Sequence, residues 1–484
     1  MRVQPMLING EWVFASDNAV IDVINPATEE VFAQVPQATA EDVKRAVEAT
    51  HRAFPAWARL SPFGRGEYLR KASHLALQRV EDIARTISEE EGKPLREAHE
   101  EVEKAADILR YYAEEGERIY GRVVHNVDPS SYSTVIYQPK GPCAAIAPWN
   151  YPVELIAWKV GAALAAGCTV VAKPSVIAPL SPLLFLKCVA DAGVPPGVIN
   201  GVTGTGSVVG RELIDNPLVK KVAFTGSTAV GKTIMHEHAE TLKSFSLELG
   251  SSCPLIVCED CDLDAVFNGA VRRSFRNNGQ VCIAINRIYV QESVYEEFID
   301  RFVEATKKLT IGNPLVNVNC DLGPMATKDG LEKVKQHVED ALKRGAKLAC
   351  GGKRPEGSEF EKGFWFEPTI IINVDHSALV MREETFGPVV GVMKFKSLDE
   401  AIRLANDAPY GLASYAYTND LHKARRLAEE LQSGNVAINN VDAGVINAPY
   451  GGWKDSGMGY EHGPEGLYEY LKAKHVRVSF YSAV

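Results

Sequence analysis

The 484-residue sequence has no long apolar run and no apolar leader. Its longest apolar stretch, residues 160–172, has thirteen residues between two lysines, which is too short to cross a bilayer. The first residues, MRVQPMLINGEW, lack the apolar core of a secretory signal. Both absences predict a cytoplasmic protein without a membrane partner.

Basic clusters and a paired cysteine pattern are also missing. The net charge is −10 and no stretch gathers lysine and arginine, which argues against a nucleic-acid partner. The nine cysteines are scattered and odd in number, which argues against a disulfide framework. Cys258 and Cys261 have metal-ligand spacing, but no second pair or histidine cluster completes four ligands, so the sequence predicts no metal site.

The composition that remains is average for a globular protein, with 46% apolar and 24% charged residues. A chain of this length exceeds one ordinary hydrophobic core, so two or three domains are expected. Residues 31–120 show a helical pattern rich in Ala, Glu and Arg, with breaks near Pro62 and at residues 92–94.

Two extended segments stand apart from the helical pattern. Residues 122–139, RVVHNVDPSSYSTVIYQP, read as two strands joined by a polar turn, and residues 474–480, KHVRVSF, alternate apolar and polar side chains. Such distant strands can build a small sheet outside the main domains, and its edges can pair with another subunit.

Strands and helices alternate at short intervals between residues 143 and 249, which predicts a parallel sheet covered by helices. The short motifs PWN, KPS, GTG and TGS all follow predicted strands in this segment. Because ligands of such sheets bind beyond the carboxyl ends of the strands, these motifs are expected to converge on one crevice. A second α/β segment follows, from about residue 250 to about residue 445.

The stretch FTGSTAVGKT, residues 224–233, matches the phosphate-binding pattern G-x-x-x-x-G-K-[ST] in full. It lies between a strand-like and a helix-like run, as that pattern requires. Glycines and a helix N-terminus suit any phosphate group, so an ATPase and a dinucleotide-binding protein both remain open at this point.

Three residues are candidates for chemistry, each with a structural alternative. Cys282 follows a predicted helix break at Gly279 and Gln280, where backbone N–H groups would lower the thiol pKa and hold an oxyanion; the alternative is a buried cysteine without a role. Glu248, between two leucines, is either a general base with a raised pKa or half of an ion pair. Asn150 either donates its amide to an oxyanion or forms a turn.

The motifs PWNYP, KPS, FTGS, LELG, NNGQVC, EETFGP and GGWKDSGMG occur in an order and spacing that resemble the aldehyde dehydrogenase superfamily, nearest to its succinate-semialdehyde and lactaldehyde dehydrogenase-like branch. The resemblance covers nearly the whole chain, from INPATEEV onward. It implies an α/β fold with three domains. A Rossmann-like nucleotide-binding domain would span residues 1–118 and 140–249, an α/β catalytic domain residues 250–448, and a small β oligomerisation domain residues 119–139 and 467–484. It also implies a homo-oligomer, either a dimer or a dimer of dimers.

By this resemblance, the Cys282 thiolate attacks an aldehyde, the Asn150 amide and the Cys282 N–H hold the oxyanion, and Glu248 activates the water that hydrolyses the thioester. The stretch FTGSTAVG then receives NAD or NADP rather than ATP, which is consistent with the several strands that precede it. The implied cofactor residues are Trp149, Lys173, Ser175, Val176, Gly206, Gly226, Ser227, Val230, Glu384 and Phe386.

One of these positions bears on the choice of cofactor. NAD-restricted relatives often carry a glutamate where this chain has Val176, and a carboxylate there would repel a 2′-phosphate. Acceptance of NADP is therefore expected, with Lys173 and Ser175 able to meet the phosphate.

The substrate residues implied by the resemblance are Tyr151, Leu155, Trp158, Arg276, Ile283 and Tyr450. Arg276 resembles an arginine that succinate-semialdehyde dehydrogenases use for a carboxylate, but Trp158 and Gly463 replace its two companions. The expected substrate is a small polar aldehyde or semialdehyde; the alternative is that Arg276 faces solvent or pairs with Glu154.

Ser251 departs from the family pattern, where LELG is often followed by a second glycine. Coenzyme A-acylating relatives commonly lack the glutamate, so Glu248 favours hydrolysis over acyl transfer. A catalytically silent structural protein on the same scaffold is the remaining alternative, and the joint presence of Cys282, Glu248 and Asn150 argues against it.

Overall fold

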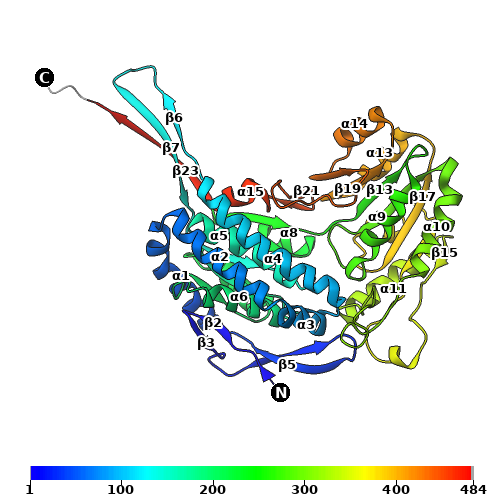
Figure 1. Cartoon of the computed structure of the whole chain (residues 1–484), viewed down its shortest axis with the longest axis horizontal. Coiled ribbons are helices and arrows are strands. Elements are labelled where there is room, and N and C mark those ends of the chain that lie inside the picture. The colour runs from blue at the N-terminus through cyan, green and yellow to red at the C-terminus, as the bar shows by residue number, and fades with distance from the viewer. Residues whose placement is uncertain (1, 481–484) are drawn as a thin grey trace.

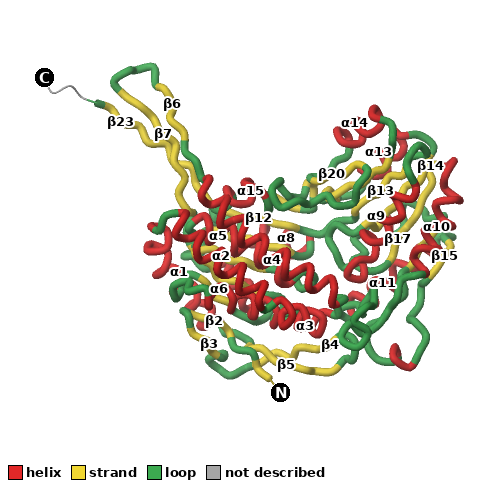
Figure 2. Tube along the Cα trace, viewed as in Figure 1, coloured by secondary structure: helices red, strands yellow, loops and turns green. Residues whose placement is uncertain are grey.

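The computed structural model describes residues 2–480, and these residues form two large sheets and three small ones (Figures 1 and 2). The first large sheet has eight strands in the order β22-β12-β11-β8-β9-β10-β2-β3. Its five central strands are parallel, as the alternating pattern predicted. They are β8 (Pro142–Ile146), β9 (Thr169–Lys173), β10 (Ile199–Gly201), β11 (Lys221–Thr225) and β12 (Ser244–Glu248).

Helices cover both faces of this sheet. On one face α5 (Pro152–Ala166) and α6 (Leu180–Asp191) pack directly on the strands. An outer layer of α2 (Pro62–Gln78), α3 (Val80–Glu91) and α4 (Leu95–Glu115) packs on these two helices. On the other face lie α1 (Ala40–Arg59), α7 (Arg211–Asp215) and α8 (Thr228–Glu237). Gly167 ends α5 with a φ of 93°, a conformation that costs glycine little.

The helix breaks expected from the sequence are confirmed. Ser61 caps α2 (Pro62–Gln78), and Pro62 occupies its first turn. Gly92 ends α3 (Val80–Glu91) in the left-handed conformation, and α4 (Leu95–Glu115) begins after Pro94. The helical pattern did not reveal β5 (Glu30–Pro36), which pairs with β4 (Val20–Asn25) at the beginning of the segment.

The second large sheet has seven strands in the order β15-β16-β17-β14-β13-β19-β20. Helices α9 (Leu263–Phe275) and α10 (Tyr295–Lys307) cover one face, and α11 (Lys328–Lys343), α13 (Leu398–Asn406) and α14 (Leu421–Glu430) lie against the other. The strands of this sheet are β13 (Cys253–Val257), β14 (Ile285–Gln291), β15 (Lys347–Cys350), β16 (Thr369–Ile372), β17 (Val389–Phe395), β19 (Ala413–Tyr417) and β20 (Asn435–Ile438).

The two extended segments form one antiparallel sheet that projects from the body of the molecule (Figure 1). β7 (Ser131–Pro139) lies between β6 (Arg122–His125) and β23 (Leu471–Ser479), and it pairs with β23 along its whole length. The joining of these distant segments agrees with the small sheet expected from the sequence. Its surface exposes apolar side chains, among them Val123 (69%) and Phe480 (61%).

Short strands from both ends of the chain complete the first sheet, which the sequence did not reveal. β2 (Met6–Ile8) and β3 (Glu11–Val13) extend one edge, and β22 (Gly457–Met458) pairs with β12 at the other. Gly457, the first residue of β22, therefore lies opposite Glu248, the last residue of β12. Of the helices within residues 2–480, none has the length and apolar character needed to span a bilayer.

Candidate active site

A chain reversal after α9 presents Cys282. Asn277, Asn278 and Gly279 have φ angles of 47°, 58° and 70°, so three consecutive residues are left-handed. Asparagine and glycine adopt this conformation more readily than other residues, which explains the sequence NNG. A Cβ on Gly279 would lie 2.2 Å from the carbonyl oxygen of Gly387, so side chains are excluded there.

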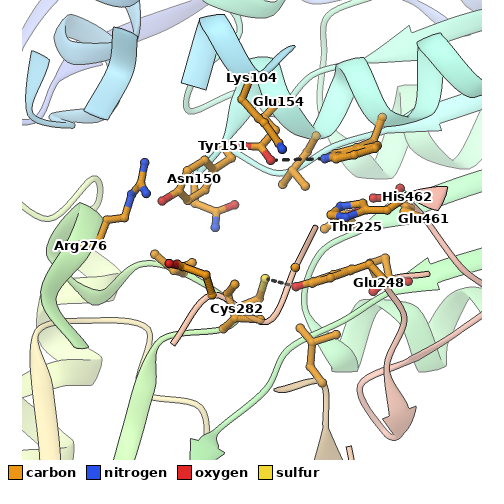
Figure 3. A pocket seen from close by; sticks show the side chains of 18 of the residues that line it. Lys104, Asn150, Tyr151, Glu154, Thr225, Glu248, Arg276, Cys282, Glu461 and His462 are labelled. Carbon is orange, nitrogen blue, oxygen red and sulfur yellow. Dashed lines mark hydrogen bonds between the residues drawn. The ribbon is translucent and has the colours of Figure 1, made fainter. Parts of the chain in front are cut away.

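The Cys282 thiol lies at the bottom of a cavity, with its Sγ 3.5 Å from Tyr450 Oη (Figure 3). Its backbone N–H forms no hydrogen bond to an acceptor within residues 2–480, as a donor to an incoming oxyanion should. Burial raises the pKa of the thiol to about 12. The expectation of a lowered pKa is therefore wrong for this state, because desolvation of the thiolate outweighs the hydrogen bond from Tyr450.

Asn150 follows β8 and is held mainly through its backbone. Its carbonyl oxygen accepts hydrogen bonds from Lys93 Nζ (2.6 Å) and from Asn277 Nδ2 (3.1 Å). Its side-chain Nδ2 donates to the carbonyl oxygen of Gln280 at 3.0 Å. An amide nitrogen has two hydrogens, so one donor stays available to the cavity that Asn150 and Cys282 share.

Glu248 ends β12 and lines the same cavity. Neither carboxylate oxygen has a hydrogen-bond partner among the described residues, and burial together with the nearby Glu461 carboxylate raises the pKa of Glu248 well above its usual range. Glu461 is itself paired with Lys159, whose Nζ lies 2.6 Å from Glu461 Oε1. Glu248 is thus not half of an ion pair, and its free oxygens suit the acceptance of a proton from water.

Two cavities meet at Cys282. The first, of about 360 Å³, contains all six residues expected to contact the substrate. The second, of about 250 Å³, lies along the carboxyl ends of the strands of the first sheet. Both are lined by Asn150, Leu155, Thr225, Leu249 and Cys282.

Five of the ten expected cofactor residues line the second cavity. The five are Trp149, Gly226, Ser227, Glu384 and Phe386. Ser227 caps α8 and accepts a hydrogen bond from the backbone N–H of Val230, so the positive end of this helix faces the cavity. The other five lie outside this cavity; they are Lys173, Ser175, Val176, Gly206 and Val230.

Lys173, at the end of β9, is buried and has no acidic partner within residues 2–480. Desolvation lowers its pKa to about 8. Its Nζ donates to the carbonyl oxygen of Pro174 at 3.1 Å. Around Gly206 the space is open, since a Cβ there would meet no atom within 4 Å. A ligand along this edge therefore has room near an unpaired ammonium group.

The lysine of the GKT stretch does not face the phosphate-binding turn. Lys232 Nζ pairs with Asp455 Oδ2 at 2.6 Å, and Thr233 Oγ1 donates to the carbonyl oxygen of Ala229. The two residues that would grip a nucleoside triphosphate and its metal are thus already bound elsewhere, which argues against an ATPase.

Ser251 fits the turn where the family often has glycine. Its backbone N–H donates to Glu384 Oε1 at 2.9 Å, and its hydroxyl lies 3.4 Å from Cys253 Sγ. The contact with Glu384 uses the backbone alone, so the serine side chain leaves it unchanged.

Arg276 lies at the mouth of the first cavity but is already paired. Its Nη2 donates to Glu100 Oε2 at 2.8 Å, and its Nε lies 3.9 Å from Glu97 Oε2. The expected alternative partner, Glu154, instead accepts from Trp158 Nε1 at 3.3 Å. A guanidinium has five donors, so this pairing leaves some of them free for a substrate carboxylate.

Several residues of the first cavity were missed by sequence reasoning. Lys104 and Glu100 are one turn apart on α4, and Glu461 and His462 follow β22; all four come from segments far from Cys282 in the sequence. No local motif marks them. The signal that could have placed Glu461 and His462 was the pairing of β22 with β12. A two-residue strand, Gly457–Met458, is too short to be predicted from the sequence.

A free thiol, an amide donor and an unpaired carboxyl thus meet where two cavities join, on an α/β fold. The chain belongs to the aldehyde dehydrogenase family, whose sequence model matches residues 12–476.

Two curated relatives and one solved structure show the breadth of the similarity. Succinate-semialdehyde dehydrogenase [NADP(+)] GabD of Escherichia coli (strain K12) is 43% identical over 476 residues, covering 98% of this chain and 97% of that protein. Glutarate-semialdehyde dehydrogenase of Pseudomonas putida is 43% identical over 479 residues, covering 98% of both. Betaine aldehyde dehydrogenase (betB) from Staphylococcus aureus in complex with NAD+ is 36% identical with a TM-score of 0.95, covering 98% of this chain and 94% of that one.

The high thiol pKa leads to a test. With a pKa of about 12, the thiolate fraction of Cys282 should rise about tenfold per pH unit between about pH 7 and about pH 10. The rate of alkylation by iodoacetamide should follow it, measured by mass spectrometry on the peptide that carries Cys282. A rate that levels off above about pH 9.5 would show instead that the thiol ionises as an ordinary cysteine.

Proposed function

We propose that this chain oxidises a small polar aldehyde to its carboxylic acid through covalent catalysis by Cys282. Membership of the family and the semialdehyde dehydrogenases among its relatives support aldehyde oxidation with NAD or NADP. The observation that carries the proposal is the meeting of the two cavities at Cys282, between Asn150 and Glu248.

We propose that the second cavity, together with the open edge near Gly206, receives a nicotinamide dinucleotide. Gly226 and the N-terminus of α8 suit a pyrophosphate, and we propose Glu384, which lines the cavity, and Lys173, at the end of β9, for the two ribose units. When bound, such a cofactor supplies a hydride acceptor beside the sulfur. Trp149 and Phe386, whose rings lie 5.4 Å apart, form an apolar wall that keeps water away from the nicotinamide end.

The protein residues then carry the remaining steps. The Cys282 thiol passes its proton to water, its sulfur bonds to the aldehyde carbon, and the Asn150 amide and the Cys282 N–H hold the oxyanion. Loss of hydride from that carbon to a bound nicotinamide cofactor would leave a thioester. Glu248 takes a proton from water, the water oxygen bonds to the thioester carbon, and the C–S bond breaks to release the acid and the thiol.

Two other functions remain as alternatives. Acyl transfer to coenzyme A is not supported by the relatives, and the free carboxyl of Glu248 favours water as the acceptor. A catalytically silent protein would have no need for an unpaired buried carboxyl, because leaving such a group without a partner costs stability.

We infer that the substrate carries a polar group toward Arg276. The six proposed contact residues combine an apolar wall with this one guanidinium. Because Glu100 already binds Arg276, a substrate carboxylate has to share the guanidinium with it. Succinic semialdehyde, lactaldehyde and glyceraldehyde are the proposed candidates.

We further propose a cytoplasmic homo-oligomer with domains at 1–118 and 140–249, at 250–448, and at 119–139 and 467–484. The apolar side chains on the projecting sheet support assembly through that sheet, because large exposed apolar patches mark interfaces. A dimer or a dimer of dimers would satisfy its edges.

Catalysis is tested by two substitutions. Cys282→Ala should abolish aldehyde oxidation, while Glu248→Gln should allow one burst of reduced cofactor per active site and then stop, because thioester hydrolysis lacks its base. Stopped-flow absorbance of the reduced cofactor measures both. Cys261→Ser, a cysteine outside both cavities, serves as the matched control. Steady turnover by Glu248→Gln would contradict the assigned base.

Substrate recognition is tested by the ratio of kcat/KM for succinic semialdehyde to that for hexanal. Arg276→Phe should lower this ratio by about tenfold or more, since a charge-assisted hydrogen bond is lost. Glu100→Gln should raise it, because the competing carboxylate is removed. An unchanged ratio in Arg276→Phe would mean that Arg276 does not contact the substrate.

Cofactor choice is tested by comparing kcat/KM for NADP and NAD. Val176 brings no negative charge to the site and Lys173 offers an unpaired ammonium, so NADP should be accepted. Lys173→Met should reduce kcat/KM for NADP more than for NAD. A preference of the wild type for NAD above about a hundredfold, or about 2.7 kcal/mol, would contradict this prediction.

Assembly is tested by a charge in the projecting sheet. Val123→Glu should shift the mass measured by light scattering toward the monomer at micromolar concentration, because a buried charge without a partner destabilises an interface. Leu421→Glu is the matched control, because Leu421 is an exposed leucine on α14, outside the projecting sheet. A fully active wild-type monomer would contradict the proposed oligomer.

A further inference from the structure

One polar group of the substrate cavity has no role in the steps above. His462 lies in the turn before α15 (Gly463–Tyr468) and is 8% exposed. Its imidazole is stacked between two aromatic rings, with its centroid 3.6 Å from that of Trp158 and 4.7 Å from that of Tyr450. The interplanar angles are 14° and 17°, so the ring is fixed in one plane. It lines the cavity on the side away from Arg276 in Figure 3.

The contacts of His462 fix its protonation. Nδ1 lies 3.2 Å from the carbonyl oxygen of Val445, which can only accept, so Nδ1 carries the hydrogen. Burial lowers the pKa of His462 to about 3, and the nearby ammonium groups of Lys104 and Lys159 act in the same direction. The imidazole is therefore neutral at working pH, and Nε2 presents a lone pair.

Nε2 has no hydrogen-bond partner among the residues that the structure describes. The stacked rings prevent the imidazole from turning this lone pair elsewhere. Nε2 opens onto the cavity instead of being sealed inside the protein, so a donor group on a ligand can reach it.

We propose that His462 Nε2 accepts a hydrogen bond from a hydroxyl group on the carbon chain of the aldehyde, so that the substrate class is a hydroxyaldehyde. This inference rests on the proposed function and narrows its substrate. A carboxylate has no hydrogen to donate and would face the lone pair with its own negative charge. Several charged groups of the cavity already have partners, since Arg276 binds Glu100, Arg273 pairs with Asp442, and Glu154 accepts from Trp158.

An ammonium group could also donate to Nε2. The charge of the lining does not separate the two donors, because Lys104, Arg273 and Arg276 line the cavity together with five carboxyl groups. A hydroxyl group meets the acceptor without the desolvation cost of a charge.

The test compares aldehydes of matched shape in wild type and in His462→Phe, which keeps an aromatic ring in the stack and removes the acceptor. The ratio of kcat/KM for 4-hydroxybutanal to that for pentanal, which has a methyl in place of the hydroxyl, should fall about threefold to tenfold. A second pair, 3-hydroxypropanal and butanal, has a chain one carbon shorter and shows which hydroxyl position reaches His462. The ratio of kcat/KM should fall for at least one of the two pairs. His462→Gln, which offers an amide oxygen, should restore part of the ratio.

Equal ratios in wild type and His462→Phe for both pairs would overturn the inference, as would a fall seen only for 4-aminobutanal. His462→Leu provides a second variant if His462→Phe does not fold, with the same expected fall. If wild type oxidises none of these aldehydes with either cofactor, the proposed function itself fails. If it oxidises them with ratios that do not depend on residue 462, only the role of His462 fails.

Discussion

The buried ammonium group of Lys93 is the interaction on which the geometry of the site depends. It is fully buried in the link between α3 and α4, where it is paired with Glu101 and lies 3.4 Å from Glu91 Oε2. A buried charge is tolerated only where partners surround it, so Lys93 draws them together. One of them is the carbonyl oxygen of Asn150, 2.6 Å from Nζ, and the ring of Tyr151 lies 3.8 Å from the same atom. Through these contacts, the link between α3 and α4 in the outer helical layer holds the loop that follows β8 in place.

The same network reaches the nucleophile. Asn277 Nδ2 donates both to Glu91 Oε1 (2.6 Å) and to the carbonyl oxygen of Asn150, while its backbone N–H donates to Glu97. The left-handed turn that presents Cys282 is thus joined to the loop that presents the Asn150 amide. The two donors proposed for the oxyanion come from different sheets, and this shared set of carboxylates holds them in one position.

Whether a feature could be predicted from the sequence depends on how far apart in the chain the interacting residues lie. The βα units, the breaks at Pro62 and Gly92, and the NNG turn are set by neighbouring residues, so local patterns predicted them. The partners of Lys93 and the approach of β22 to β12 join segments far apart in the chain, and no local pattern contains them. The thiol pKa of Cys282 was expected in the wrong direction for the same reason, because burial is a property of the assembled cavity.

The substrate cavity shows how pairing within the protein decides which groups are left for a ligand. Its charged side chains would suggest strong recognition of an ion, yet Arg276, Arg273 and Glu461 each already have a partner. A group that is paired in the free enzyme gains little from a ligand that has to replace that partner, since one ion pair is exchanged for another. The carboxyl of Glu248 and the Nε2 of His462 are unpaired among the described residues, so each gains a hydrogen bond from a water or substrate molecule that enters the cavity. Glu248 is proposed to face the water that completes the reaction, so among the unpaired acceptors of the cavity the one on His462 is left to discriminate among small aldehydes of similar shape.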